Sequence, residues 1–212
     1  MSLVDSLVFK GYLKTPRIQK AFQKIKRIDF LPEEFKYLAE VDEALPIGRG
    51  QTISQPSVVA FMMELLQPKE GDKILDVGSG SGWTTALLAS IVGEKGKVIG
   101  VELIPELKEF GERNVAKYNF IEKGIVEFIC ADGSQGYKTA APYDKILVSA
   151  AARERVPLAL KEQLKQEGRI VIPIGNSIYL LIKKEYDFKN QRYRFEKHEY
   201  PGFVFVPLIE AK

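Results

Sequence analysis

The sequence predicts an α/β fold in which a mostly parallel, doubly wound sheet has helices on both faces. Short apolar runs alternate with segments of helical periodicity between residues 73 and 174, which is typical of a parallel sheet. A glycine-rich turn separates the first of these runs from a helix. After Gly175 the chain is β-rich and contains no helical segment, which predicts antiparallel strands at one edge. We expect a single domain, 1–212, made of a helical extension with a loop (1–55), an α/β core (56–175) and a β-rich C-terminal part (176–212).

Composition limits the class of protein. The chain has 212 residues, 45% of them hydrophobic and 28% charged, an ordinary balance for one globular domain. A net charge of +3 gives no reason to expect a nucleic-acid partner. Cys130 is the only cysteine, so an internal disulfide is not possible and a reducing compartment is compatible. The N-terminus does not resemble a signal peptide, and no apolar run approaches the ~20 residues that span a bilayer. We expect a cytoplasmic monomer without a membrane partner.

The first quarter of the chain is predicted to be helical. Val4, Leu7 and Val8 recur at helical spacing, and Thr15-Pro16 has the residue types of an N-cap and a first helical position. The stretch from 40 to 55 has little periodicity, so we expect an irregular but ordered loop there. It ends at Pro56, where a helix is expected to begin and to run through Leu66. Ser54 then lies at or just before the start of this helix, where a simple capping role is one interpretation.

The core elements follow in alternation. Strands are expected at 74–77, 97–102, 125–130, 143–151 and 168–174, with helices at 84–92, 105–118 and 157–166 between them. The remaining segments, 177–185, 192–200 and 203–209, are expected to be β-structure, with a hairpin loop at 187–191.

The turn after the first core strand is the strongest candidate for a ligand site. Gly78, Gly80 and Gly82 alternate there, and such a turn lets a ligand lie against bare backbone at a helix N-terminus. Trp83 occupies the place of the third glycine in the dinucleotide fingerprint, which argues against close packing around a pyrophosphate. Asp76, just before the turn, suits a ligand with a cationic end. Glu102, at the end of the next strand, is placed to hold ribose hydroxyls.

Together these residues resemble the S-adenosylmethionine site of class I methyltransferases, although a glycine turn alone is often only a tight connection. Asp132 and Gly133 follow the third core strand, at the sheet edge that faces the ligand in such folds. Asp132 is placed either to accept a hydrogen bond from an adenine amino group or only to shape a turn. No cluster of His, Cys and Asp has metal-ligand spacing, so no metal is expected, and the single histidine, His198, is interpreted as structural or exposed.

A more specific resemblance covers nearly the whole chain. The run Asp42-Glu43-Ala44-Leu45-Pro46-Ile47-Gly48, followed by Gly50-Gln51-Thr52-Ile53-Ser54-Gln55-Pro56, resembles the signature loop of protein-L-isoaspartate O-methyltransferases. The segments 131–134, 168–175 and 205–208 resemble the same family. The resemblance implies transfer of a methyl group from S-adenosylmethionine to the free carboxylate of L-isoaspartyl, and also D-aspartyl, residues in damaged proteins. The methyl ester then collapses to a succinimide that hydrolyses partly to aspartate.

The resemblance also implies roles for individual residues. Ser54 is the active-site serine, whose hydroxyl orients the substrate carboxylate. Val206 and Pro207 contact the substrate peptide, with an ordinary edge strand as the alternative. The cofactor-binding residues are Gln51, Thr52, Ile53, Asp76, Gly78, Gly80, Ser81, Glu102, Asp132 and Gly133. Arg49, Trp83, Ala131 and Ile209 depart from the common pattern of the family, which leaves substrate preference and C-terminal contacts open.

Two other readings remain open at this stage. A class I methyltransferase that acts on RNA or a small molecule is one. An amino-group methylase acting on nucleobases would be expected to have an Asn-Pro-Pro-Tyr-like motif after the fourth strand, where this chain has Ser149-Ala150-Ala151-Ala152. The other is a nucleotide-binding module or an inactive adaptor, against which the intact acids at 76, 102 and 132 argue.

A carboxylate substrate is already ionised at neutral pH, so transfer to it would need alignment more than a general base.

Overall fold

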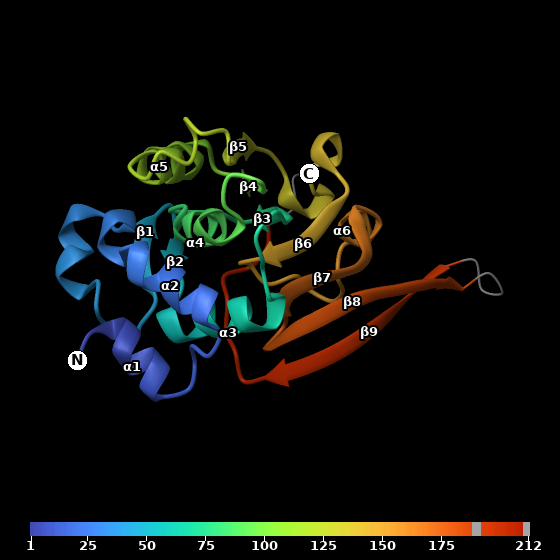
Figure 1. Ribbon diagram of the computed structural model, residues 1–212, viewed down its shortest axis with the longest axis horizontal. Helices are drawn as coiled ribbons and strands as arrows, with labels where there is room; N and C mark the ends of the chain where they lie inside the picture. Colours follow the sequence, from blue (N-terminus) through green and yellow to red (C-terminus); the bar gives the residue numbers. More distant parts are fainter. Residues whose placement is uncertain (188–191, 210–212) are drawn as a thin grey trace.

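The computed structural model describes residues 1–187 and 192–209, and its centre is a seven-stranded sheet (Figure 1). The strand order is β5-β4-β3-β6-β7-β8-β9, in which β3 to β7 are parallel and β8 and β9 are antiparallel. The bounds are β3 Lys73–Val77, β4 Lys97–Glu102, β5 Val126–Cys130, β6 Tyr143–Val148, β7 Leu164–Ile174, β8 Ser177–Asp187 and β9 Arg192–Pro201. The predicted α/β class, with antiparallel strands at one edge, is confirmed.

The order of the strands places a crevice beside β3. The chain proceeds from β3 to β4 and β5 in one direction, and then returns to lay β6 on the opposite side of β3. At the ends of these strands Val77 pairs with Val101 of β4 on one side and with Val148 of β6 on the other. Ligands bind at such a switch point, outside the carboxyl ends of the strands.

Helices cover the two faces of the sheet unequally. On one face, α3 (Pro56–Leu66), α4 (Trp83–Val92) and α5 (Pro105–Ala116) share a buried cluster with Ile74, Val98 and Val171. On the other face, Leu75 and Val77 belong to a second cluster with residues of α6 (Leu158–Glu162) and of the 3-10 turn Lys138–Ala140. Another 3-10 turn, Gly133–Gln135, packs against α6. Strand residues therefore alternate between two cores, as a sheet buried on both faces requires.

The N-terminal extension packs on the same side as α3 and α4. It contains α1 (Leu3–Phe9), α2 (Pro16–Lys24) and two 3-10 helices, η1 (Arg27–Phe30) and η2 (Glu33–Leu38). Thr15 is the N-cap of α2 and Pro16 its first residue, as predicted. The Thr15 hydroxyl, however, donates to Glu64 Oε2 at 2.6 Å instead of capping its own helix. This bond ties the start of α2 to α3.

The stretch from 40 to 55, expected to be irregular, contains a two-stranded hairpin. Its strands are β1 (Leu45–Gly48) and β2 (Gln51–Ile53). Gly48 pairs with Gln51, so the turn consists of two residues, Arg49 and Gly50, both with positive φ. Helix α3 begins at Pro56 as predicted, but its N-cap is Gln55, so Ser54 is not the capping residue. Asp42 Oδ1 accepts the Ser57 amide of this first turn at 2.8 Å.

The C-terminal third differs from the prediction at several boundaries. β6 ends at Val148 rather than at 151, α6 is shorter than expected, and β7 begins already at Leu164. The expected strand at 203–209 is absent from the described residues: Pro207 makes only an isolated bridge with Ala151. Of the expected hairpin loop at 187–191, only Asp187 lies within the described residues, at the end of β8.

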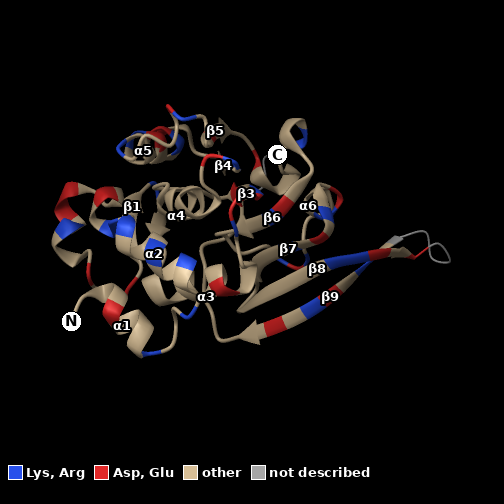
Figure 2. Cartoon of the chain, in the orientation of Figure 1, with Lys and Arg blue, Asp and Glu red and all other residues tan. Residues whose placement is uncertain are grey.

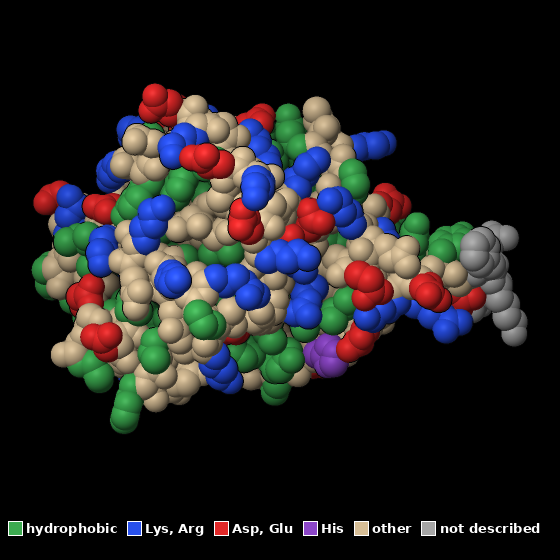
Figure 3. Space-filling view, in the orientation of Figure 1, with side chains coloured by type: hydrophobic (Ala, Val, Ile, Leu, Met, Phe, Trp, Pro, Cys, Tyr) green, Lys and Arg blue, Asp and Glu red, His purple; other side chains and the backbone are tan. Residues whose placement is uncertain are grey.

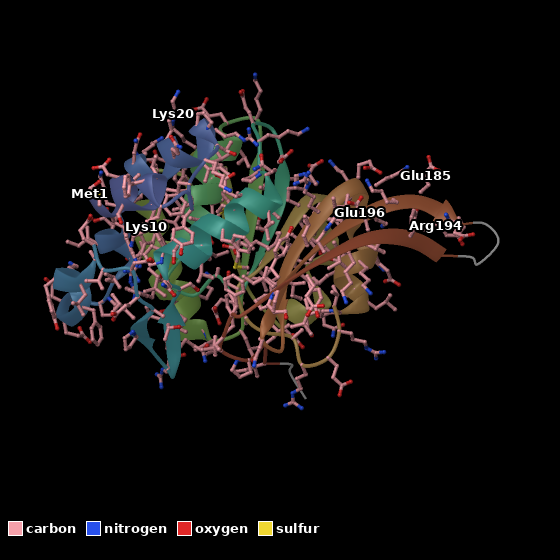
Figure 4. All side chains as sticks on the ribbon, turned by 90° about the horizontal axis from the view of Figure 1, so that it is seen from below. Met1, Lys10, Lys20, Glu185, Arg194 and Glu196 are labelled. Carbon is pink, nitrogen blue, oxygen red and sulfur yellow. The ribbon has the colours of Figure 1, made fainter. Side chains whose placement is uncertain are left out.

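The β8–β9 pair extends away from the rest of the molecule. Figure 4 shows Glu185, Glu196 and Arg194 on this arm, at the opposite end from Met1, Lys10 and Lys20. Charged residues lie along the arm and on the outer helices (Figure 2), and on the face seen in Figure 3 the two signs are interspersed. No helix in the described part of the chain has the length and apolar character needed to cross a membrane.

Candidate cofactor and substrate site

A pocket of about 780 Å³, open to solvent at its mouth, lies at the switch point. The hairpin forms one wall, the glycine turn and the end of β4 form another, and residues 206–209 border it with Ser149 and Ala150. Most of the predicted site residues meet here: Gln51, Thr52, Ile53, Ser54, Gly78, Gly80, Ser81, Glu102, Gly133, Val206 and Pro207. Asp76 and Asp132 are not among the lining residues.

The glycine turn brings bare backbone to the pocket wall. Gly78, Gly80 and Gly82 all have positive φ, and a Cβ on Gly80 would lie 3.2 Å from Ile47 Cδ1 of the hairpin. A Cβ on Gly82 would lie 2.8 Å from the carbonyl oxygen of Gly111 in α5. Close packing at the third glycine therefore does occur, between the turn and α5, and Gly82 rather than residue 83 provides it. Sequence reasoning missed Gly111, whose signal is a lone glycine inside a helical segment.

Trp83 takes part in the packing behind the pocket as well as in its wall. Its side chain is buried, with its ring 5.6 Å from the Phe22 ring in an edge-to-face arrangement. The guanidinium of Arg27 lies 5.5 Å from the centre of the Trp83 ring. The large aromatic residue thus joins the N-terminal extension to the first turn of α4.

Two backbone amides hold the Glu102 side chain, one from the glycine turn and one from the residues just after β4. Its Oε2 accepts the Gly80 amide at 2.9 Å, and its Oε1 accepts the Ile104 amide at 3.0 Å. The side chain is buried yet lines the pocket. A carboxylate has about four acceptor positions, so two backbone bonds leave capacity for a ligand hydroxyl. The ribose-binding role predicted for this residue stays a prediction.

Asp76 is not among the residues that line the pocket, and its predicted contact with a cationic group stays a prediction. It is fully buried, and its Oδ2 accepts hydroxyl hydrogens from Thr84 at 2.8 Å and Thr85 at 2.6 Å. Oδ1 has no hydrogen-bond partner within the described structure. Burial raises the Asp76 pKa to about 6, the two threonine hydroxyls oppose this rise, and Glu102 adds to it. Asp76 reaches the pocket only through Thr84, which lines it.

Asp132 and Gly133 were both predicted to bind the cofactor, but only Gly133 lines the pocket. Asp132 Oδ1 accepts the Ser134 amide at 2.8 Å, so the turn-shaping alternative is present in the structure. Gly133 lines the pocket, and a Cβ at this position would collide with Val77 Cγ1. The glycine is therefore required by packing against β3, whatever else it contacts.

Ser54 lies immediately after β2 and lines the pocket, half-buried. Its carbonyl oxygen is 3.4 Å from Arg27 Nη2. Sequence reasoning missed Arg27 as well as Ser149 and Ala150. The position of Ser149 and Ala150, directly after a core strand at the switch point, is a signal that could have identified them.

The electrostatics of the pocket are simple. Among its lining residues, Glu102 is the only one with an ionisable side chain. His198 is exposed on β9, 2.7 Å from Glu196 Oε1, and Cys130 is exposed. Within the described residues no group of three His, Cys, Asp or Glu side chains is arranged to hold a metal ion. The described pocket wall thus offers hydroxyls, backbone and apolar surface.

The fit of an adenosyl sulfonium ligand can be tested on these features. The bare backbone of Gly78 and Gly80 would suit its amino-acid end, and the buried Glu102 carboxylate would suit its ribose hydroxyls. The apolar wall of Val101, Leu103 and Ile104 would suit its adenine. The residues present fit the group.

Comparisons with known proteins agree with this site. The family model described as protein-L-isoaspartate(D-aspartate) O-methyltransferase matches residues 1–212. A protein-L-isoaspartate O-methyltransferase of Methanopyrus kandleri is 44% identical over 210 residues, covering 98% of this chain and 89% of its own. One from Archaeoglobus fulgidus is 48% identical over 192 residues, covering 91% and 84%. A Plasmodium falciparum structure in complex with S-adenosyl-L-homocysteine shares the fold, with a TM-score of 0.83 at 23% identity over 99% of this chain and 97% of that one. The chain belongs to the protein-L-isoaspartate (D-aspartate) O-methyltransferase family.

Proposed function

We propose that this protein methylates the free carboxylate of L-isoaspartyl and D-aspartyl residues in damaged proteins, using S-adenosylmethionine, and so starts their conversion through a succinimide to aspartate. Besides family membership, one observation carries the proposal: among the described residues that line the pocket, Glu102 is the only one with an ionisable side chain. A carboxylate nucleophile is already charged at neutral pH. A pocket without a general base therefore suits this acceptor better than a hydroxyl or an amine, which would have to lose a proton.

The cofactor half of the pocket is proposed to be the glycine turn with Glu102. Gly78, Gly80 and Ser81 would lie along the amino-acid end of S-adenosylmethionine, and Glu102 would accept hydrogen bonds from the ribose hydroxyls. Gly133, with Asp132 behind it, would border the adenine. Bound S-adenosylmethionine supplies a methyl group that its sulfonium already activates. The protein then has to hold both partners in line, which contributes about 7–11 kcal/mol at best in well-oriented reactions.

The substrate half is proposed to lie between Ser54 and the segment around Pro207. The Ala151 amide donates to the Val206 carbonyl at 2.8 Å, and the Leu208 amide donates to the Ala151 carbonyl at 2.8 Å. These two bonds hold 206–208 extended along the pocket rim, where Val206 and Pro207 would contact the substrate backbone. The Ser54 hydroxyl, on the hairpin side, would orient the carboxylate. Gln51, Thr52 and Ile53 would separate the reacting groups from solvent.

The partner proposed for this site is a polypeptide with an isoaspartyl residue. The mixed surface charge seen in Figure 3 supports a protein that acts without nucleic acid or membrane. We extend the proposal to a cytoplasmic monomer, for which the support is the single exposed Cys130 and ordinary composition.

A tritiated-methyl assay with two peptides of the same sequence, one isoaspartyl and one aspartyl, tests the function. We expect base-labile methyl ester to form on the isoaspartyl peptide and at least 100-fold more slowly on the aspartyl peptide. Hydroxyl and backbone donors recognise where a carboxylate lies rather than its charge alone, so the isomers should be distinguished. Comparable rates on the two peptides, or no ester on either, would remove the repair function.

A further inference from the structure

Arg27 lies outside the pocket lining, yet it is bonded to the segment that forms one pocket wall. Its side chain is only 4% exposed. Nη1 donates to the Val41 carbonyl at 2.9 Å and to the Ala39 carbonyl at 3.4 Å. Nη2 donates to the Glu43 carbonyl at 2.6 Å and to the Ser54 carbonyl at 3.4 Å. One guanidinium thus serves four backbone oxygens of the segment 39–54.

The two carbonyls on Nη2 are the two ends of the β1–β2 hairpin. Glu43 lies two residues before β1, and Ser54 follows the last residue of β2. Leu45 pairs with Ile53 between them. A single nitrogen therefore joins both strands at the open end of a hairpin with only seven residues in its strands, which is marginal by itself. Only the planar fork of arginine reaches several acceptors in this manner.

The same guanidinium also contacts the opposite wall. Its carbon lies 5.5 Å from the centre of the Trp83 ring, and Trp83 lines the pocket at the start of α4. Burial lowers the Arg27 pKa to about 10 while nearby Asp42 and Glu40 raise it, so the group remains charged at neutral pH. Cation–π contact with an indole and bonds to backbone carbonyls both favour that charged state.

We propose that Arg27 is a positioning residue for methyl transfer: it fixes the hairpin, and with it Ser54, at a set distance from the glycine turn by joining the hairpin base to Trp83. This inference rests on the proposed function, because Ser54 is the group that it places. Arg27 itself touches neither cofactor nor substrate. A displacement near 1 Å in such a site lowers the rate by about 100-fold.

The variant Arg27→Lys tests this role, since it keeps the positive charge but offers a single nitrogen. We expect kcat on the isoaspartyl peptide to fall about 10- to 100-fold, with KM for the peptide changed by less than about threefold. The matched control is Arg169→Lys, which removes a similar bond between a guanidinium and the Leu65 carbonyl (2.9 Å) away from the pocket. It should retain kcat within about twofold.

Two readouts are independent of activity. Hydrogen exchange of the amides in β1 and β2 should be at least about tenfold faster in Arg27→Lys, while β3 stays unchanged. Trp83 is the only tryptophan, so its fluorescence should shift in Arg27→Lys and not in Arg169→Lys. These measurements remain informative if wild-type protein methylates neither peptide. That result would refute the proposed function but not the contact of Arg27 with the hairpin.

Two outcomes would overturn the inference. One is wild-type kcat and hairpin exchange in Arg27→Lys. The other is a loss of activity that merely follows the unfolded fraction measured by thermal unfolding, which would make Arg27 a stabilising residue only. Arg27→Met keeps the length of the side chain and removes its charge. In folded Arg27→Met the amides of β1 and β2 should exchange as fast as they do in Arg27→Lys. Slow exchange in folded Arg27→Met would also refute the role.

Discussion

Replacing Asp76 with Asn tests the electrostatics behind the glycine turn. The carboxyl is fully buried, and burial raises its pKa from 3.8 to about 6 although Thr84 and Thr85 donate to it. In the unfolded chain the same group titrates near its ordinary value of ~3.9. Between about pH 4 and 6 the folded protein therefore binds more protons here than the unfolded chain does, and this difference makes stability fall as pH rises.

The magnitude follows from the two pKa values. The change from 3.8 to about 6 corresponds to about 3 kcal/mol, at 1.36 kcal/mol per pH unit. The stability linked to the protonated carboxyl is fully present below about pH 4 and is lost as pH rises through about 6. Asn carries no charge at any of these pH values and can still accept from both threonines. Relative to wild type, Asp76→Asn should therefore gain up to about 3 kcal/mol of unfolding free energy between pH 4 and 7.

Urea unfolding from pH 4 to 7.5 measures this difference. Asp144→Asn is the control, because the Asp144 pKa is lowered: hydrogen bonds from Lys165 and the Lys73 amide outweigh the opposing effect of burial. That group contributes stability above its unfolded pKa and loses it only as pH falls below about 4, so Asp144→Asn should differ from wild type by a constant amount across the window. A constant difference for Asp76→Asn as well would refute the reasoning about Asp76.

Three other substitutions test the walls of the pocket. Glu102→Gln should weaken S-adenosylhomocysteine binding in calorimetry by about 10- to 100-fold, since bonds to a charged acceptor contribute about 1.5–3 kcal/mol each; Glu127→Gln, on the neighbouring strand, should change it by less than about twofold. Ser54→Ala should lower kcat on the isoaspartyl peptide about tenfold or more while S-adenosylhomocysteine affinity stays within about threefold; equal kcat would exclude the orienting role. Gly82→Ala should lower the melting temperature by several degrees, because its Cβ would lie 2.8 Å from the Gly111 carbonyl at a φ of +83°; an unchanged melting temperature would contradict this close packing.

The sequence was sufficient to predict the elements whose pattern is local. Apolar runs predicted β4 to the residue and β3 except for its first residue, and Pro16 and Pro56 predicted the starts of α2 and α3. The glycine turn and Glu102 could be assigned to one site because parallel strands bring their carboxyl ends to the same edge. These predictions depend on neighbours in sequence, or on a topological rule that holds for the whole fold class.

The features that escaped prediction depend on partners distant in sequence. The β1–β2 hairpin has the two-residue turn Arg49-Gly50, which is not one of the common two-residue turn sequences, and Arg27 is bonded to both ends of its base. Asp76 was expected to contact a cationic group because it precedes the glycine turn, and that contact stays a prediction, but its bonds to α4 were not foreseen. Its orientation toward Thr84 and Thr85 follows from the packing of α4 on β3, which a strand pattern cannot specify.

The placement of charge explains how such a pocket can select a carboxylate without offering it a cation. A buried arginine in the wall would attract carboxylates of every kind, including the ordinary aspartates that cover protein surfaces, and discrimination by position would be weakened. Arg27 is instead turned away from the pocket, with its charge directed to four carbonyls and to Trp83. In the proposed complex the carboxylate would meet groups such as the Ser54 hydroxyl and backbone, whose hydrogen bonds weaken steeply with distance and angle. The two isomers differ by one methylene in the position of the carboxylate, so selectivity between them is best tested on variants that move the hairpin. Such variants should methylate the isoaspartyl peptide more slowly and the aspartyl peptide no faster.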